Sequence, residues 1–177
     1  CPEHAIAARF EEGIRRPIEA RLVDRAPCQE VVWTGADADL TRLPIPMMHV
    51  KDGGPYISAT LVVSKDPEYG RNVGSYRMMY RTPHETGIDL VSPSDMRVYY
   101  QRALDQGRPL EIAVAIGVHP FELLAASYKA PIAVDEFAIA GGLHGAPVDL
   151  VRCRTVDLEV PAEAELVLEG ELLPIGW

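Results

Sequence analysis

Apolar and polar positions along the first third of the chain predict a helix followed by an extended segment. Residues 3–15 place Ile6, Phe10 and Ile14 at helical spacing, which predicts a short amphipathic helix. Prolines interrupt the apolar positions between residues 28 and 48. Because proline fixes φ and cannot donate to a ladder, we expect this segment to be an extended strap and not part of a sheet.

The pattern then changes to β-branched and aromatic runs separated by turn residues. A turn at residues 52–55 precedes a predicted strand over 56–64, and further strands are expected over 72–81 and 87–91. A continuous apolar run over 110–116 predicts a buried strand. Near the end of the chain we expect strands over 148–153 and 165–172, with an edge piece at 158–161.

Three more short helices are expected among these strands. Ser94 or Asp95 can cap a helix that Gly107 ends, and two others are predicted over residues 119–126 and 135–143. Six or seven strands with three or four short helices predict an α+β domain. We expect a barrel-like sheet with the helices inserted in its connections.

Composition limits the class of protein. The 177 residues are 47% hydrophobic, which suits one compact domain, and no apolar run approaches the roughly 20 residues that cross a bilayer. Three cysteines without metal-type spacing argue against a disulfide framework and favour the cytoplasm. The net charge of −9 disfavours nucleic-acid binding. The chain starts at Cys1, so we expect it to be part of a longer protein.

Two glutamates near the C-terminus are candidate acid/base groups. Glu165 and Glu169 are four residues apart in a predicted strand, so both side chains project from the same face. Arg77, far upstream, could pair with them. In a buried group of this kind one carboxyl would stay protonated while the guanidinium keeps the other ionised. The alternative is a solvated strand face, which is the commoner fate of such glutamates.

Four separated motifs give the chain a family resemblance. They are Asp-Gly-Gly-Pro-Tyr at 52–56, Asn-Val-Gly-Ser-Tyr-Arg at 72–77, Asp-Leu-Glu-Val-Pro-Ala at 157–162 and Ala-Glu-Leu-Val-Leu-Glu-Gly at 164–170. In this order they resemble the UbiD family of reversible decarboxylases. Almost the whole chain is covered by the match.

The resemblance implies a split β-barrel over residues 51–177, preceded by a helix and strap over 1–50. It also implies non-oxidative decarboxylation of an aromatic or α,β-unsaturated carboxylic acid, a lyase reaction with prenylated FMN as electron sink. A flavin prenyltransferase would supply the cofactor, and the full-length protein would be a homo-oligomer. The alternative is a non-catalytic flavin-binding or assembly module that needs missing domains or a partner chain.

Site roles follow from the same resemblance. Arg77 would hold the substrate carboxylate, and Glu165 or Glu169 would protonate the carbon that CO₂ leaves, with Glu169 favoured. The residues expected to contact the flavin are Gly74, Ser75, Tyr76, Arg77, Ala126, Ser127 and Tyr128.

A divalent metal, Mn²⁺ or Mg²⁺, and a monovalent ion, K⁺ or Na⁺, are implied beside the cofactor phosphate. Asn72 matches the family's amide ligand and Glu136 its carboxylate ligand. The third family ligand is a histidine, but residues 91–95 contain none. Asp95, a serine or water is expected to replace it. The alternatives are that Asp95 caps a helix and that Glu136 only complements a helix dipole.

Overall fold

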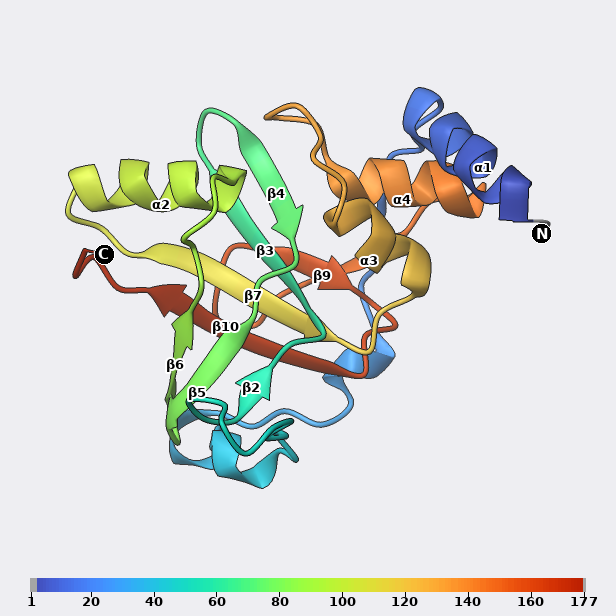
Figure 1. Cartoon of the computed structure of the whole chain (residues 1–177). Coiled ribbons are helices and arrows are strands. Elements are labelled where there is room, and N and C mark those ends of the chain that lie inside the picture. Colours follow the sequence, from blue (N-terminus) through green and yellow to red (C-terminus); the bar gives the residue numbers. More distant parts are fainter. Residues whose placement is uncertain (1–2, 177) are drawn as a thin grey trace.

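In the computed structural model, residues 3–176 are described, so Cys1 lies outside them. A four-stranded antiparallel sheet with the order β10-β7-β3-β4 forms the centre of the molecule (Figure 1). Two three-stranded sheets, β1-β8-β9 and β2-β5-β6, lie beside it. The helices are α1 (Glu3–Arg15), α2 (Asp95–Asp105), α3 (Pro120–Ala126) and α4 (Glu136–His144). The strands are β1 (Arg21–Leu22), β2 (Tyr56–Ile57), β3 (Thr60–Asp66), β4 (Gly70–Gly74), β5 (Met78–Thr82), β6 (Glu85–Ile88), β7 (Leu110–Ile116), β8 (Asp149–Arg152), β9 (Glu159–Pro161) and β10 (Leu166–Leu172).

The central sheet is buried on both faces, and this explains the continuous apolar run of β7. Ala113 and Ala115 pack into one core with α3, α4 and β8, whereas Ile112 and Val114 pack into a second core with α2. Successive residues of a strand point to opposite faces. Each apolar residue of the run therefore enters one of the two cores, and none of these four is exposed.

The α+β class is confirmed, but a closed or split barrel is not, because the described strands fall into three separate sheets. The strand predicted over residues 72–81 is wrong as one element. It divides into β4, which pairs with β3, and β5, which pairs with β2 and β6. The residues between them leave the first sheet, and the Thr60 hydroxyl donates a hydrogen bond to the Tyr76 carbonyl at this point. The predicted strand over 56–64 is likewise divided, into β2 and β3.

The segment over residues 28–48 forms no strand, as predicted, but it is not extended throughout. Residues 27–42 contain three short 3-10 helices, Pro27–Gln29, Gly35–Asp37 and Leu40–Arg42. The two-residue strand β1, which pairs in parallel with β8, was not predicted. Among residues 3–176, no helix combines the length and the apolar character needed to cross a membrane.

Strand β4 is an edge strand of the central sheet, and three helices surround it. Figure 1 shows α2 on one side of β4 and α3 with α4 on the other, and each of these helices contacts β4. Helix α1 packs on α4 at a close crossing, where a Cβ on Gly142 would lie 2.3 Å from the Gly13 carbonyl oxygen. Glycine is therefore required there, and the crossing fixes α4 beside the β4 edge.

Candidate functional site

An ion-pair network holds the start of α4 against β4. The Arg71 guanidinium pairs with Asp135 and, at 2.9 Å, with Glu159 of β9. Asp135 is also the N-cap of α4 and accepts a hydrogen bond of 2.9 Å from the Phe137 N–H. The three charges are largely shielded from solvent, since Arg71 exposes 18% of its side chain. The network therefore determines where the next residue, Glu136, can place its carboxylate.

Glu136 is a buried carboxylate that forms no ion pair with a cationic side chain among residues 3–176. It is 5% exposed, and its Oε2 accepts a hydrogen bond of 2.9 Å from the Val73 N–H on the free edge of β4. The pKa of Glu136 is raised to about 7, chiefly by burial; the charges of Asp135 and Asp95 add to this rise, and backbone hydrogen bonds oppose it. A carboxylate in this position needs either a proton or a cation to be stable. The helix-dipole alternative does not account for a side chain that reaches back to β4.

Asn72, Tyr76 and the start of α2 complete the polar cluster around Glu136. Asn72 is buried in β4, and its Nδ2 lies 3.5 Å from Ser64 Oγ. Burial raises the pKa of the Tyr76 hydroxyl, and hydrogen bonds with Ser94 and Asn72 partly offset this effect. The Tyr76 hydroxyl thus joins the end of β4 to the start of α2.

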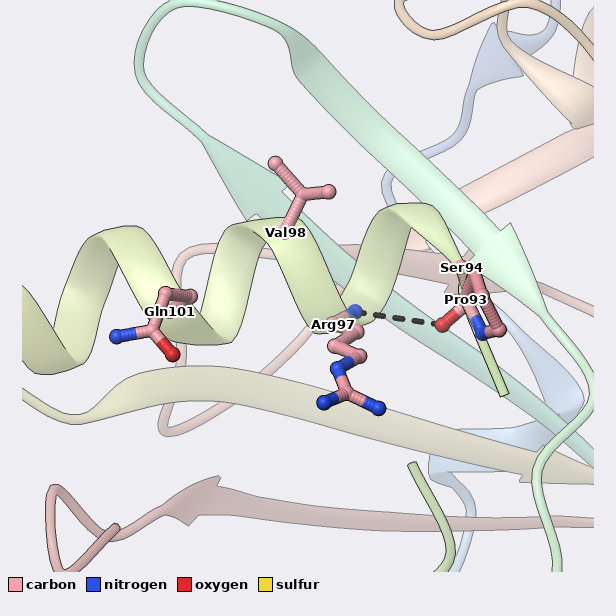
Figure 2. A pocket seen from close by; sticks show the side chains of 5 residues that line it. All are labelled: Pro93, Ser94, Arg97, Val98 and Gln101. Atoms are coloured by element: carbon pink, nitrogen blue, oxygen red, sulfur yellow. Dashed lines mark hydrogen bonds between the residues drawn. The ribbon is translucent and has the colours of Figure 1, made fainter. Parts of the chain in front are cut away.

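Asp95 faces the same cluster and is not the cap of α2. Ser94 is the N-cap, because its Oγ accepts the Arg97 N–H at 3.3 Å (Figure 2). Desolvation raises the pKa of Asp95, and its charge raises the pKa values of Tyr76 and Glu136 in turn. The capping alternative for Asp95 is therefore wrong, and its half-buried carboxylate remains available to a ligand.

The donor set at the β4 edge fits a hard divalent cation. Asn72 has an amide oxygen, and Asp95 and Glu136 have carboxylates; these are oxygen ligands of the kind that Mg²⁺ and Mn²⁺ prefer. Among residues 3–176, no group of three or more histidine, cysteine, aspartate or glutamate side chains is arranged to hold a metal. Asn72 and two carboxylates would therefore hold the ion only with further oxygens from water or from a bound phosphate.

The residues expected to contact a flavin lie in two stretches, one at the end of β4 and one at the end of α3. Gly74 ends β4, and the Tyr76 ring lies over it, so a Cβ on Gly74 would be 2.5 Å from that ring. Ser75 is exposed. Ala126 ends α3, and the following residue, Ser127, donates a hydrogen bond of 2.8 Å to the Leu123 carbonyl. The two stretches therefore follow elements that contact each other, α3 and β4.

Tyr128 differs from the other expected flavin contacts. Its ring packs edge-to-face on Phe10 of α1, with 5.6 Å between the ring centroids. This contact orients the ring toward α1 in the described structure. Tyr128 therefore supports the helix packing, and its expected flavin contact remains a prediction.

The structure does not bring Arg77 together with Glu165 and Glu169. The Arg77 side chain is 68% exposed and pairs with Asp89 at 2.6 Å, just after β6. Among residues 3–176, neither glutamate forms an ion pair with Arg77. The expected three-charge pocket is thus corrected. The guanidinium forms its ion pair with Asp89, which directly follows β6, and not with the two glutamates.

The two glutamates also differ from each other. The Glu169 carboxylate accepts hydrogen bonds from the Arg154 N–H at 2.9 Å, and from the N–H and hydroxyl of Thr155 at 2.6 Å each. It therefore holds the loop between β8 and β9. Glu165 is exposed, and its side chain lies over Gly117, where a Cβ would come within 2.5 Å of Glu165 Cγ.

Sequence reasoning missed three residues of the site. Arg71 positions α4, Ser64 contacts Asn72, and Tyr99 of α2 carries a buried hydroxyl close to Asp95 and Glu136. None belongs to a motif, and only the fold reveals their proximity. A separate hollow on the outer side of α2 has no acidic lining residue (Figure 2). It is lined by Pro93, Ser94, Arg97, Val98 and Gln101.

Comparison with known proteins now decides the family. Residues 21–175 match the UbiD family described as the 3-octaprenyl-4-hydroxybenzoate carboxy-lyase Rift-related domain. The chain belongs to the UbiD family. This UbiD chain is 38% identical over 174 residues to anhydromevalonate phosphate decarboxylase of Methanothermobacter thermautotrophicus. The matched residues are 98% of this chain and 40% of that relative.

Solved UbiD-class structures share the fold. The enzyme HmfF from Pelotomaculum thermopropionicum in complex with FMN is 42% identical, with a TM-score of 0.91 over 97% of this chain and 39% of that chain. Vanillic acid decarboxylase of Sedimentibacter hydroxybenzoicus in its closed form is 35% identical, with a TM-score of 0.88 over 96% of this chain and 38% of that one. The UbiD chain described here thus spans about two fifths of the relatives that it matches.

Proposed function

We propose that this chain is the flavin-binding domain of a non-oxidative, reversible decarboxylase that uses prenylated FMN. One observation carries the proposal: in a UbiD-family chain, the buried Glu136 carboxylate accepts the Val73 N–H at the open edge of β4, and the charge of Asp95 acts on it. The similarity to an FMN complex of HmfF and to a prenylated-FMN complex of an evolved dimeric HmfF supports the cofactor.

The proposed substrate is an aromatic or α,β-unsaturated carboxylic acid. Loss of CO₂ from an sp² carbon leaves an electron pair that no described side chain can delocalise. When bound, prenylated FMN supplies the electron sink for this pair. The protein would hold the cofactor, exclude water and orient the acid. Likeness to decarboxylases named for vanillic acid and 3,4-dihydroxybenzoic acid supports the substrate class.

A divalent cation, Mn²⁺ or Mg²⁺, is the proposed link between the protein and the cofactor phosphate. Asn72, Asp95 and Glu136 would hold it, and a cation there would also neutralise the buried Glu136 carboxylate. A K⁺ or Na⁺ ion nearby is part of the same proposal. Gly74, Ser75 and Tyr76, with Ala126 and Ser127 opposite, would contact the flavin.

Arg77 is the proposed binding group for the substrate carboxylate. Its guanidinium is exposed and directly follows Tyr76 in the chain, and a guanidinium can bind a carboxylate with two hydrogen bonds. To do so it would exchange Asp89 for the substrate. The Glu169 carboxylate holds the β8–β9 loop through its hydrogen bonds, so we assign it no proton transfer, and Glu165 forms no ion pair among residues 3–176.

The second candidate function is a flavin-binding module that needs other parts of a longer protein for chemistry. It is favoured by the separation of Arg77 from both glutamates, since the described residues contain no assembled proton donor beside the site. In this case the chain would bind the cofactor through the same β4 edge. The two candidates therefore agree on flavin binding and differ on turnover.

The deciding experiment is production of the full-length protein together with a flavin prenyltransferase, followed by absorbance and mass spectrometry of the retained ligand. We expect retained prenylated FMN, loss of it in Asp95→Asn and Glu136→Gln, and retention in the matched control Glu165→Gln. Turnover of aromatic and acrylic acids by the loaded protein separates the enzyme from the module. A wild-type protein that retains no flavin would contradict both candidates.

A further inference from the structure

The Tyr99 hydroxyl is a buried polar group without a partner. The side chain lies in α2 and is 1% exposed, and its hydroxyl has no hydrogen bond within the described residues. The ring stacks on Tyr69 with 6.2 Å between centroids and 17° between planes. Phenylalanine would provide the same packing without a buried hydroxyl. The hydroxyl therefore needs an explanation outside the packing of the ring.

The charges of three carboxylates act on this hydroxyl. Burial raises the pKa of Tyr99, and the charges of Asp95, Asp66 and Glu136 raise it further. Asp95 precedes Tyr99 by one helical turn, and a helical side chain leans toward the N-terminus, so both groups share one face of α2. Tyr99 is thus directed toward the same end of α2 as the cation site.

Asp66 does not require Tyr99. Its Oδ2 accepts the Arg102 Nε–H at 3.0 Å, and its Oδ1 accepts the backbone N–H groups of Glu68 at 2.9 Å and Tyr69 at 3.2 Å. Asp95 and Glu136 are the two carboxylates in the neighbourhood for which no ion pair occurs among residues 3–176. Of the carboxylates whose charges act on Tyr99, those two are therefore the ones that still need a partner.

We propose that Tyr99 is a positioning residue for the divalent cation, and that its hydroxyl oxygen accepts a hydrogen bond from a water ligand of an ion held by Asn72, Asp95 and Glu136. The inference rests on the proposed function. No carboxylate lies within hydrogen-bond distance of the hydroxyl, so an intervening water accounts for the spacing. Mg²⁺ and ions like it keep several water ligands, and groups that orient such ligands strengthen binding.

The test is a Mn²⁺ titration of the full-length protein reconstituted with FMN, with free Mn²⁺ followed by electron paramagnetic resonance. We expect Tyr99→Phe to weaken Mn²⁺ binding about 10-fold, as other outer ligands of metal sites do. The matched control is Tyr100→Phe, because the Tyr100 hydroxyl donates to the Leu173 carbonyl at 2.9 Å and lies in the same helix. The control should leave the Mn²⁺ dissociation constant unchanged.

Metal-free unfolding distinguishes positioning from a merely structural role. Tyr99→Phe should keep or raise the thermal midpoint without metal, since it removes an unpaired buried hydroxyl, and should lose part of the stabilisation that Mn²⁺ gives the wild type. A Mn²⁺ affinity within twofold of the wild type in Tyr99→Phe would overturn this inference while the proposed function stands. Absence of Mn²⁺ binding by the FMN-loaded wild type would overturn both.

Discussion

Acidic side chains occupy both the β4 edge and the odd-numbered face of β10, but their surroundings differ. At the β4 edge, Glu136 is buried and accepts the Val73 N–H, and neither Glu136 nor Asp95 has an ion-pair partner among residues 3–176. On β10, Glu169 accepts three hydrogen bonds from the Arg154–Thr155 loop. A carboxylate whose hydrogen bonds come from the protein needs no ligand, whereas a buried carboxylate without enough partners needs a proton or a bound cation.

The largest expected effect comes from removing the support of the β4 edge. Arg71→Leu leaves Asp135 and Glu159 without their shared partner, and stranded buried charge costs about 3 to 5 kcal/mol. We expect the free energy of unfolding to fall by that order in urea denaturation. Arg71→Lys is the matched variant, because it keeps the charge but cannot bond both carboxylates at once. Equal stability of Arg71→Leu and the wild type would show that the network does not position α4.

The next effect concerns pH. The folded pKa of Glu136, about 7, exceeds its ordinary value of 4.5, so the folded state binds the proton more tightly than the unfolded state. The stability that protonated Glu136 gives the folded state is fully present below about pH 4.5 and is lost as pH rises through 7. Without metal, Glu136→Gln should remove this loss and be more stable than the wild type at pH 8 by about 3 kcal/mol.

Thermal or urea unfolding in EDTA at pH 5 and pH 8 measures this difference. Saturating Mn²⁺ should stabilise the wild type at pH 8 and have no effect on Glu136→Gln. The contrary result would be a wild type that loses no more stability than Glu136→Gln from pH 5 to pH 8. It would show that other groups of the protein stabilise the charged Glu136 carboxylate.

A smaller effect is expected on β10. Glu169→Ala removes the acceptor of the Arg154–Thr155 loop, and unpaired backbone donors there should cost about 2 kcal/mol. Glu165→Ala is the control, because the exposed Glu165 carboxylate has no hydrogen bond among the described residues. Hydrogen exchange at residues 154 and 155 should become faster only in Glu169→Ala. Unchanged exchange there, together with lost turnover in a full-length enzyme, would return Glu169 to the role of proton donor.

The smallest effect on stability is expected at Arg77. Its pair with Asp89 is exposed, and exposed pairs contribute less than about 1 kcal/mol. Arg77→Ala should therefore unfold almost as the wild type does, while the Michaelis constant for the acid rises in the full-length enzyme. Asp89→Ala frees the guanidinium and should leave substrate binding intact. A normal Michaelis constant in Arg77→Ala would remove Arg77 from the site.

Local sequence signals predicted most elements of this fold. Periodicity and caps placed the helix over residues 3–15 and the strand over 110–116 correctly, because both signals are local. The division of residues 72–81 between two sheets was missed, because nothing in its apolar pattern marks the exit after Gly74. The two-residue β1 depends on pairing with β8, more than 120 residues away, and has no local signal.

The candidate site was predicted in part, and the reason lies in the kind of information used. Asn72 and Glu136 came from the family resemblance and Asp95 was offered in place of the missing family histidine; their shared role as ligands remains a prediction, and the structure shows Glu136 buried against β4 with the charge of Asp95 acting on it. The grouping of Arg77 with Glu165 and Glu169 assumed that distant charges meet, but Asp89 and the Arg154–Thr155 loop, which no motif includes, satisfy Arg77 and Glu169. Tyr99 was missed because a buried tyrosine in a helix looks like ordinary core until its hydroxyl is traced.

The most direct test of the β4 edge as the cation site is the Mn²⁺ dissociation constant of the FMN-loaded full-length protein, measured for the wild type, Glu136→Gln and Glu169→Gln. We expect binding about 100-fold weaker in Glu136→Gln and unchanged in Glu169→Gln. Equal affinities in all three proteins, or a loss confined to Glu169→Gln, would contradict this expectation.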